Sequence, residues 1–211
     1  MPQLPHYWDE AKTHLSRNDR VLGGIIDAHP RVKLRLKKDA FTTLARAIAG
    51  QQISVKAADT IWSRVVSAAE GNIQKLQPQK ILALKIAKLR GCGLSERKTE
   101  YIRNLAARFQ QKEISGPKLA RLSDHEVKQS LVSLHGIGPW TADMYLMFNL
   151  WRPNVLPLGD VGLIRAVELH YFKGKKTPIE KIRRAAVPWA PYSTVATWYL
   201  WRSLDPIPVE Y

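Results

Sequence analysis

Residues 131–146 read LVSLHGIGPWTADMYL, and the turn at 134–138 within them, called the hairpin below, decides the fold. A helix is expected to end near Leu134, and Gly136 and Gly138 supply the backbone freedom for a tight reversal. Pro139 then opens a second helix at the position where its missing N–H costs nothing. Exposed amides at a helix start attract anions, and glycines let a large anion approach. The pattern predicts two helices joined by a phosphate-binding turn, with an ordinary tight connection as the alternative.

Helical periodicity continues outward from the hairpin. Apolar residues recur at threes and fours over 44–48 and 53–65, which predicts two helices joined by the polar turn Gly50-Gln51-Gln52. Capping-box patterns, in which a Ser or Thr precedes a Glu by three positions, occur at 123–126 and 177–180. We find neither sustained apolar–polar alternation nor a hairpin dipeptide typical of strands. The predicted fold class is therefore all-α.

One stretch, Trp151–Gly159 (WRPNVLPLG), does not read as helix. Its two prolines restrict both themselves and the residues before them, so we expect an ordered, extended connection. It leads directly into Asp160, at the expected start of a helix over 161–170.

Charge is the strongest compositional signal. The 211 residues include 33 Lys and Arg against 18 Asp and Glu, a formal net charge of +15. Such a balance favours a nucleic-acid partner, with ribosome association, anionic membranes or simple solubility as alternatives. The single cysteine, Cys92, can form no intramolecular disulfide and cannot alone hold zinc or an iron–sulfur cluster. With no apolar run of about 20 residues and no signal peptide, we expect a cytoplasmic protein without membrane contact, nucleoid-associated if bacterial. We also expect a monomer.

The hairpin and its continuation to Asp160 resemble the helix-hairpin-helix/Gly-Pro-Asp superfamily of DNA glycosylases, and within it the alkylbase, 3-methyladenine DNA glycosylase II group. Residues 41–54 (FTTLARAIAGQQIS), 91–95 (GCGLS) and 188–199 carry the same likeness. The resemblance implies two helical lobes around a DNA-binding cleft. Residues 31–133 would form the central lobe, and 1–30 with 134–211 the terminal lobe. The additional N-terminal mixed domain of longer bacterial members is not expected in a chain of this length.

Base excision needs an extruded nucleotide and a negative charge beside an oxocarbenium-like sugar. The resemblance places the catalytic aspartate at Asp160, and an N-cap is its alternative or second role. Asp143 reads as a structural acid in the first turn of a helix. Family members that also cut the backbone carry a Schiff-base lysine where this sequence has Trp140. We therefore expect a monofunctional enzyme that uses water as its nucleophile and needs no catalytic cofactor.

Trp140 and Trp198 are the expected walls of the base pocket, because indole stacks well on a positively charged alkylated purine. Packing in the core is the alternative for both. Met144 and Val161 complete the pocket at positions where the best-known family type has tyrosines, which leaves the range of lesions open.

The turn at 50–52, called the wedge turn below, resembles the family element that fills the gap left by the extruded base. Gln52 is the first candidate to insert and Gln51 the second, with a polar loop of no special role as the alternative. The resemblance further implies phosphate contacts and a structural monovalent cation, Na⁺ or K⁺, at the hairpin. The phosphate contacts fall on Leu134, Gly136, Ile137, Gly138 and Thr141, and the cation on the backbone carbonyls of Val132, Leu134 and Ile137.

The predicted function is hydrolytic release of alkylated purines, such as 3-methyladenine and 7-methylguanine, from damaged double-stranded DNA, which starts base-excision repair. Two alternatives stay open. One is a glycosylase for hypoxanthine, uracil or a mismatched base, and the other is a non-enzymatic helix-hairpin-helix DNA-binding protein.

Overall fold

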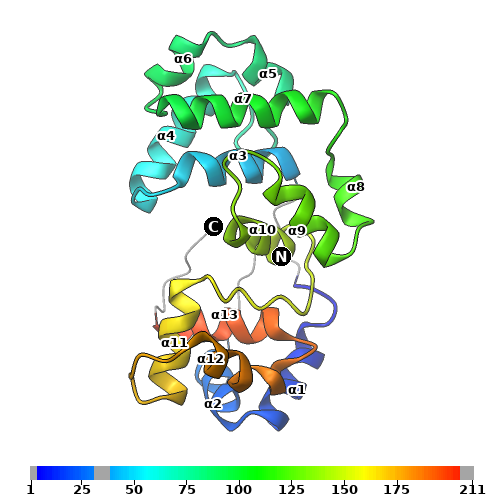
Figure 1. The fold of residues 1–211 in the computed structure, drawn as a ribbon, viewed down its shortest axis with the longest axis vertical. Helices are drawn as coiled ribbons and strands as arrows, with labels where there is room; N and C mark the ends of the chain where they lie inside the picture. The colour runs from blue at the N-terminus through cyan, green and yellow to red at the C-terminus, as the bar shows by residue number, and fades with distance from the viewer. Residues whose placement is uncertain (1–3, 31–38, 205–211) are drawn as a thin grey trace. The chain divides into compact units, whose positions relative to one another are not determined.

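The computed structural model describes residues 4–30 and 39–204, and across these ranges the regular structure is entirely helical (Figure 1). The all-α prediction is confirmed. No described helix combines the length and apolarity needed to cross a bilayer. The elements in chain order are α1 (Trp8–Asn18), α2 (Arg20–Ala28), α3 (Ala40–Gly50), α4 (Val55–Ala68), α5 (Pro78–Ala83), α6 (Ile86–Gly91), α7 (Glu96–Gln110), α8 (Gly116–Ala120), α9 (Asp124–Val132), α10 (Pro139–Phe148), α11 (Val161–Tyr171), α12 (Ile179–Ala185), the 3₁₀-helix Val187–Trp189 and α13 (Ser193–Leu204).

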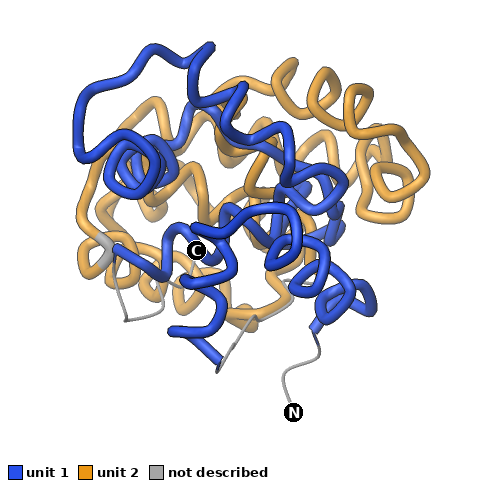
Figure 2. Tube along the Cα trace, turned by 90° about the horizontal axis from the view of Figure 1, so that it is seen from below, with its two compact units in different colours: residues 1–36, 146–211 blue, residues 37–145 orange. Residues whose placement is uncertain are grey.

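The chain divides into two compact units (Figure 2). The terminal unit comprises Met1–Leu36 with Leu146–Tyr211, and the central unit comprises Lys37–Tyr145. The expected terminal lobe began at 134, whereas the structure places 134–145 in the central unit. The physical reason is that the hairpin packs on α7, where the rings of His135 and Tyr101 stack with centroids 6.4 Å apart. The other expected boundary, at 30–31, adjoins residues outside the described part.

The terminal unit is built from α1, α2, α11 and α13 around one hydrophobic core. Leu15, Leu22 and Leu163 are fully buried there. Asp19 is buried among them, where it caps α2 and accepts hydrogen bonds from Trp189 Nε1 at 2.8 Å and from the Tyr171 hydroxyl at 2.6 Å. These bonds satisfy a carboxylate that would otherwise destabilise the core.

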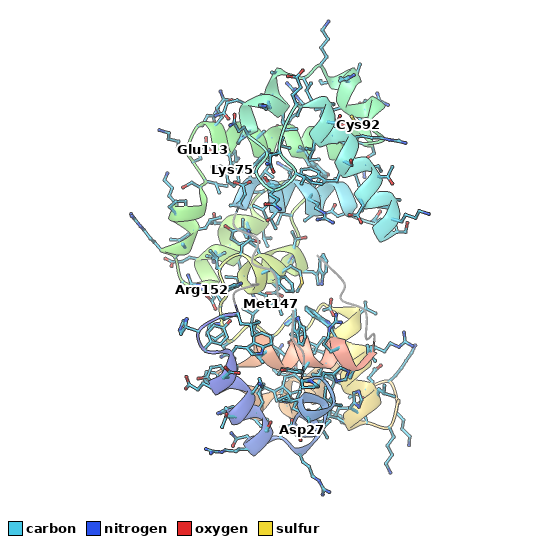
Figure 3. The ribbon with its side chains drawn as sticks, turned by 180° about the vertical axis from the view of Figure 1, so that it is seen from behind. Asp27, Lys75, Cys92, Glu113, Met147 and Arg152 are labelled. Atoms are coloured by element: carbon cyan, nitrogen blue, oxygen red, sulfur yellow. The ribbon has the colours of Figure 1, made fainter. Side chains whose placement is uncertain are left out.

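In the central unit, α7 packs against α3 and α5. Ser95 caps α7, and Ser123 with Glu126 forms the predicted capping box of α9. The predicted helices on either side of the wedge turn are α3 and α4. Cys92 is buried, and its Sγ donates to the carbonyl of Lys88 at 3.3 Å (Figure 3). The unit thus holds the hairpin and the wedge turn on one helical framework.

Candidate functional site

The connection between α10 and α11 is ordered by hydrogen bonds to Tyr7, the residue before α1, and to Thr194 of α13. The Tyr7 hydroxyl donates to the carbonyl of Trp151 at 2.9 Å. Thr194 is bonded on both sides, since its N–H donates to the carbonyl of Pro153 and its hydroxyl oxygen accepts the N–H of Val155, each at 3.0 Å. The prediction of an ordered, non-helical segment over 151–159 is confirmed.

Asp160 ends this connection and is the N-cap of α11, with extended backbone angles. Its Oδ1 accepts the Leu163 N–H at 2.6 Å and the Trp201 indole N–H at 2.7 Å. Asp160 as a whole is only 6% exposed. The N-cap role named as the alternative is therefore present, and it fixes the carboxylate in one orientation.

Trp201 is a residue that the sequence reasoning missed. Its indole lies against Asp160 and stacks on Phe148, with ring centroids 6.2 Å apart and planes 21° from parallel. Gly162 keeps this place open, because a Cβ there would lie 3.2 Å from Trp201 Cδ1 and 3.1 Å from Asp160 Oδ1. Trp201 lies one helical turn after Trp198 in α13, and this spacing is the sequence pattern that could have identified it as a site residue.

Trp198 itself lies in the core of the terminal unit and is 7% exposed. Its ring makes edge contacts with Trp8 and Tyr199, at centroid distances of 5.5 and 5.1 Å. The guanidinium carbon of Arg202 lies 5.1 Å from its centroid. This placement matches the core-packing alternative, and stacking of Trp198 on a substrate base stays a prediction.

The other predicted pocket residues differ in exposure. Val161, in the terminal unit, is 78% exposed at the start of α11. In the central unit, Met144 is buried and Trp140 half-buried in the first turn of α10. Asp143 pairs with Lys128 at 2.5 Å; burial raises the pKa of its carboxyl and Lys128 opposes that rise. The pairing supports a structural role for Asp143.

The hairpin has the predicted geometry. After α9 ends, the Ile137 N–H donates to the Leu134 carbonyl at 3.1 Å, and α10 begins at Pro139. Gly136 has a φ of +85°, and a Cβ on it would lie 2.4 Å from Tyr101 Cδ2. A Cβ on Gly138 would meet nothing within 4 Å. The turn is therefore closed on its Gly136 side and open at Gly138, and binding of a phosphate there stays a prediction.

The two glutamines of the wedge turn have different surroundings. The Gln51 side-chain amide donates to the Gly136 carbonyl at 2.7 Å, so this side chain is engaged with the hairpin. Gln52 is exposed and has a φ of +58°. The Lys98 ammonium donates to the carbonyls of Ala49 and Gln51, at 2.9 and 2.7 Å. These contacts favour Gln52 over Gln51 as the inserting residue.

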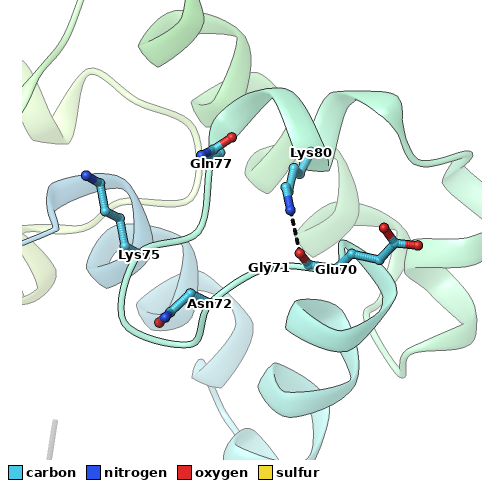
Figure 4. A pocket seen from close by; sticks show the side chains of 6 residues that line it. All are labelled: Glu70, Gly71, Asn72, Lys75, Gln77 and Lys80. Carbon is cyan, nitrogen blue, oxygen red and sulfur yellow. Dashed lines mark hydrogen bonds between the residues drawn. The ribbon is translucent and has the colours of Figure 1, made fainter.

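Two further features bear on where chemistry is possible. A pocket of about 320 Å³ opens beside the loop after α4 (Figure 4), and no predicted site residue lines it. Its lining residues are Glu70, Gly71, Asn72, Lys75, Gln77 and Lys80. Within the described ranges, no group of three or more His, Cys, Asp or Glu side chains is arranged to hold a metal ion.

Comparisons of the sequence and of the structure with known proteins agree with one another. Residues 45–191 match the family described as HhH-GPD superfamily base excision DNA repair protein. DNA-3-methyladenine glycosylase 1 of Schizosaccharomyces pombe is 33% identical over 204 residues, which cover 92% of this chain and 86% of the relative. A crystal structure of a Bacillus halodurans DNA-3-methyladenine glycosidase superposes with a TM-score of 0.83 at 34% identity, covering 93% of this chain and 89% of that one.

A second solved structure, the S. pombe 3-methyladenine DNA glycosylase in complex with abasic DNA, has a TM-score of 0.79 at 28% identity. It covers 96% of this chain and 98% of its own. The family match alone spans more than half of the chain and includes the wedge turn, the hairpin and Asp160. The chain belongs to the HhH-GPD superfamily of base excision DNA repair proteins.

Proposed function

We propose that this protein is a monofunctional DNA glycosylase that hydrolyses the N-glycosidic bond of alkylated purines in damaged double-stranded DNA. The observation that carries the proposal is the buried Asp160 carboxylate, oriented by the Leu163 amide and the Trp201 indole. Relatives named DNA-3-methyladenine glycosylases support the same conclusion.

Asp160 supplies the negative charge that the reaction needs. When the C1′–N bond breaks, its electron pair leaves on the base and the sugar becomes cationic. A carboxylate that is already oriented stabilises this cation without reorganising at the moment of reaction. Water then bonds to C1′ and loses a proton, which leaves an abasic site. An alkylated purine is itself positively charged, so it departs as a neutral base without strong acid catalysis.

The hairpin contains no amine that could form a Schiff base with C1′. Position 140 holds tryptophan, and its indole is not a nucleophile toward the sugar. The proposed enzyme therefore releases the base and leaves the DNA backbone intact.

DNA is held, in this proposal, by the hairpin amides and by a monovalent cation on the carbonyls of Val132, Leu134 and Ile137. The Leu134 carbonyl accepts the Ile137 N–H, and its second lone pair suits it to ligate a cation as well. Such a cation would add positive charge beside the bound phosphate.

We propose that Trp140, Met144, Val161 and Trp198 contact the flipped base when DNA is bound. Trp201 would act through its hydrogen bond to Asp160. Gln52 would fill the vacated position in the duplex. We further propose that the protein acts as a monomer in the cytoplasm, at the nucleoid if the source is bacterial.

Chromatography of bases released from methylated genomic DNA tests the proposal. We expect free 3-methyladenine or 7-methylguanine, no strand scission and no borohydride-trapped adduct. A defined-duplex panel with hypoxanthine, uracil and mismatches identifies any other lesion. Asp160→Asn should still bind DNA but lose turnover. If the wild-type protein binds DNA and releases no base from any of these substrates, it is a DNA-binding module and the proposal is wrong.

A further inference from the structure

We propose that Lys98 and Tyr101 of α7 are positioning residues, which hold the wedge turn and the hairpin in one fixed arrangement. The inference rests on the proposed function, because neither residue is assigned a contact with the reacting atoms. It adds a means by which the protein would select the nucleotide to extrude.

Lys98 anchors the wedge turn. Its ammonium donates to the carbonyls of Ala49 and Gln51, which lie at the C-terminal end of α3. A cation at this place satisfies carbonyls that have no partner inside the helix and complements the helix dipole. Lys98 is half-buried, and this burial lowers the pKa of its ammonium. Hydrogen bonds in such partly dry surroundings are stronger than in solvent.

Tyr101 supports the hairpin from the same side of α7. Residues three positions apart lie on one helix face, so Lys98 and Tyr101 point in similar directions. The Tyr101 ring lies close against Gly136, where a Cβ would come within 2.4 Å of its Cδ2, and it stacks on His135 at an interplanar angle of 17°. One face of α7 therefore contacts both the wedge turn and the hairpin, the two elements proposed to meet DNA.

Gln51 closes the connection between them. Its side-chain amide donates to the Gly136 carbonyl at 2.7 Å, which joins the wedge turn directly to the hairpin. The helices on either side of the wedge turn are themselves joined, because the Arg46 guanidinium of α3 pairs with Asp59 of α4 at 2.6 Å. With both sides held, Gln52 is presented from a fixed backbone.

This arrangement has a consequence for recognition. If the hairpin docks on one phosphate and Gln52 enters the base stack, the offset between them determines which nucleotide leaves the duplex. A misplacement of about 1 Å can cost up to about 100-fold in a positioned reaction. Loosening the wedge turn should therefore impair insertion while leaving the charge-driven attraction to DNA almost intact.

The test uses a duplex with a tetrahydrofuran abasic analogue beside 2-aminopurine, whose fluorescence reports stacking next to the gap. We expect Lys98→Met to reduce the fluorescence change and to lower the preference for abasic over undamaged duplex about tenfold. Lys98→Arg should restore most of both, because a guanidinium can donate to the same carbonyls. Lys75→Met, which removes an exposed charge of the same unit, should change neither preference nor fluorescence.

Thermal melts show whether each variant is folded. Gln51→Leu is the second variant, because it removes the bond to Gly136 and leaves Lys98 in place; it should reduce the same two signals. The inference is wrong if folded Lys98→Met and Gln51→Leu both keep the wild-type preference and fluorescence. It is also wrong if Gln52→Ala matches the wild type, since no side chain then inserts. Base release by the wild-type protein, measured separately, decides whether the proposed function stands.

Discussion

Replacing Asp160 with asparagine separates its charge from its role as a helix cap. The amide oxygen of Asn can accept the same two bonds, from the Leu163 N–H and the Trp201 indole N–H, that Oδ1 accepts now. Asn and Asp are about equally good N-caps, so the free energy of unfolding should change by no more than about 0.5 kcal/mol. The substitution removes the negative charge and turns the second carboxylate oxygen into an NH2 donor.

The catalytic cost follows from electrostatics. A unit charge about 4 Å from an opposite charge stabilises it by about 4 kcal/mol at an effective dielectric constant of about 20. Each 1.4 kcal/mol or so corresponds to a tenfold change in rate. Since the sugar carries only part of a positive charge in the transition state, we expect base release to slow by about 10²- to 10³-fold.

Single-turnover release of 3-methyladenine measures this rate, and thermal melts measure stability. Asp160→Ala is the matched control, because it removes charge and cap together. It should lose about 1 kcal/mol of stability and about 2–4 °C in Tm in addition to activity. If Asp160→Asn keeps its turnover within tenfold of the wild type, the carboxylate is not the source of transition-state stabilisation.

Four other substitutions have clear expected outcomes. Gly136→Ala should destabilise the protein by about 1–3 kcal/mol, because its φ is +85° and its Cβ would overlap Tyr101, whereas Gly138→Ala should melt like the wild type but bind duplex DNA more weakly. Equal Tm values for the two alanine variants would contradict this reading. Burial lowers the pKa of the His170 imidazole in the folded protein. As pH falls below about 6.5, the unfolded chain therefore binds more protons than the folded protein, and stability is lost. His170→Gln should flatten the dependence of Tm on pH below 6.5, and an unchanged slope would count against it. Trp201→Phe keeps an aromatic ring against Phe148 but removes the donor to Asp160. We expect it to lower kcat about 10-fold with little change in KM, and a change in KM alone would argue for a packing role only.

Local patterns predicted much of the fold. Three predicted features depend only on neighbours within a few positions, and all three are found. They are the capping box at Ser123 and Glu126, the proline that opens α10, and the helices on either side of the wedge turn. The second capping box, at Thr177, is wrong. Helix α12 begins at Ile179 without a side-chain cap, and the Thr177 N–H donates to Glu168 of α11 instead. A tertiary partner thus replaced the local one.

At the site too, the sequence predicted features that depend on neighbouring residues and missed those that depend on how distant segments pack. The sequence indicated Asp160 and its N-cap role, because both follow from the connection before it and the helix after it. It did not distinguish Trp198 from Trp201, which are one turn apart on a helix buried for most of its length. Which indole meets the carboxylate depends on how α13 packs against α11. Likewise, the bond that engages Gln51 and leaves Gln52 exposed spans 85 positions, so no local pattern could show it.

The buried state of Cys92 has a practical use. Cys92 is 5% exposed and its thiol is bonded to a backbone carbonyl, so maleimide reagents should react with it slowly in the folded protein. A cysteine introduced at an exposed position would then be the preferred site of labelling. Fluorescent or spin labels could be attached in this way to a chain that keeps Cys92, and a disulfide tether to thiol-bearing DNA could trap the complex for crystallisation. Neither use requires removal of a side chain that fills the core.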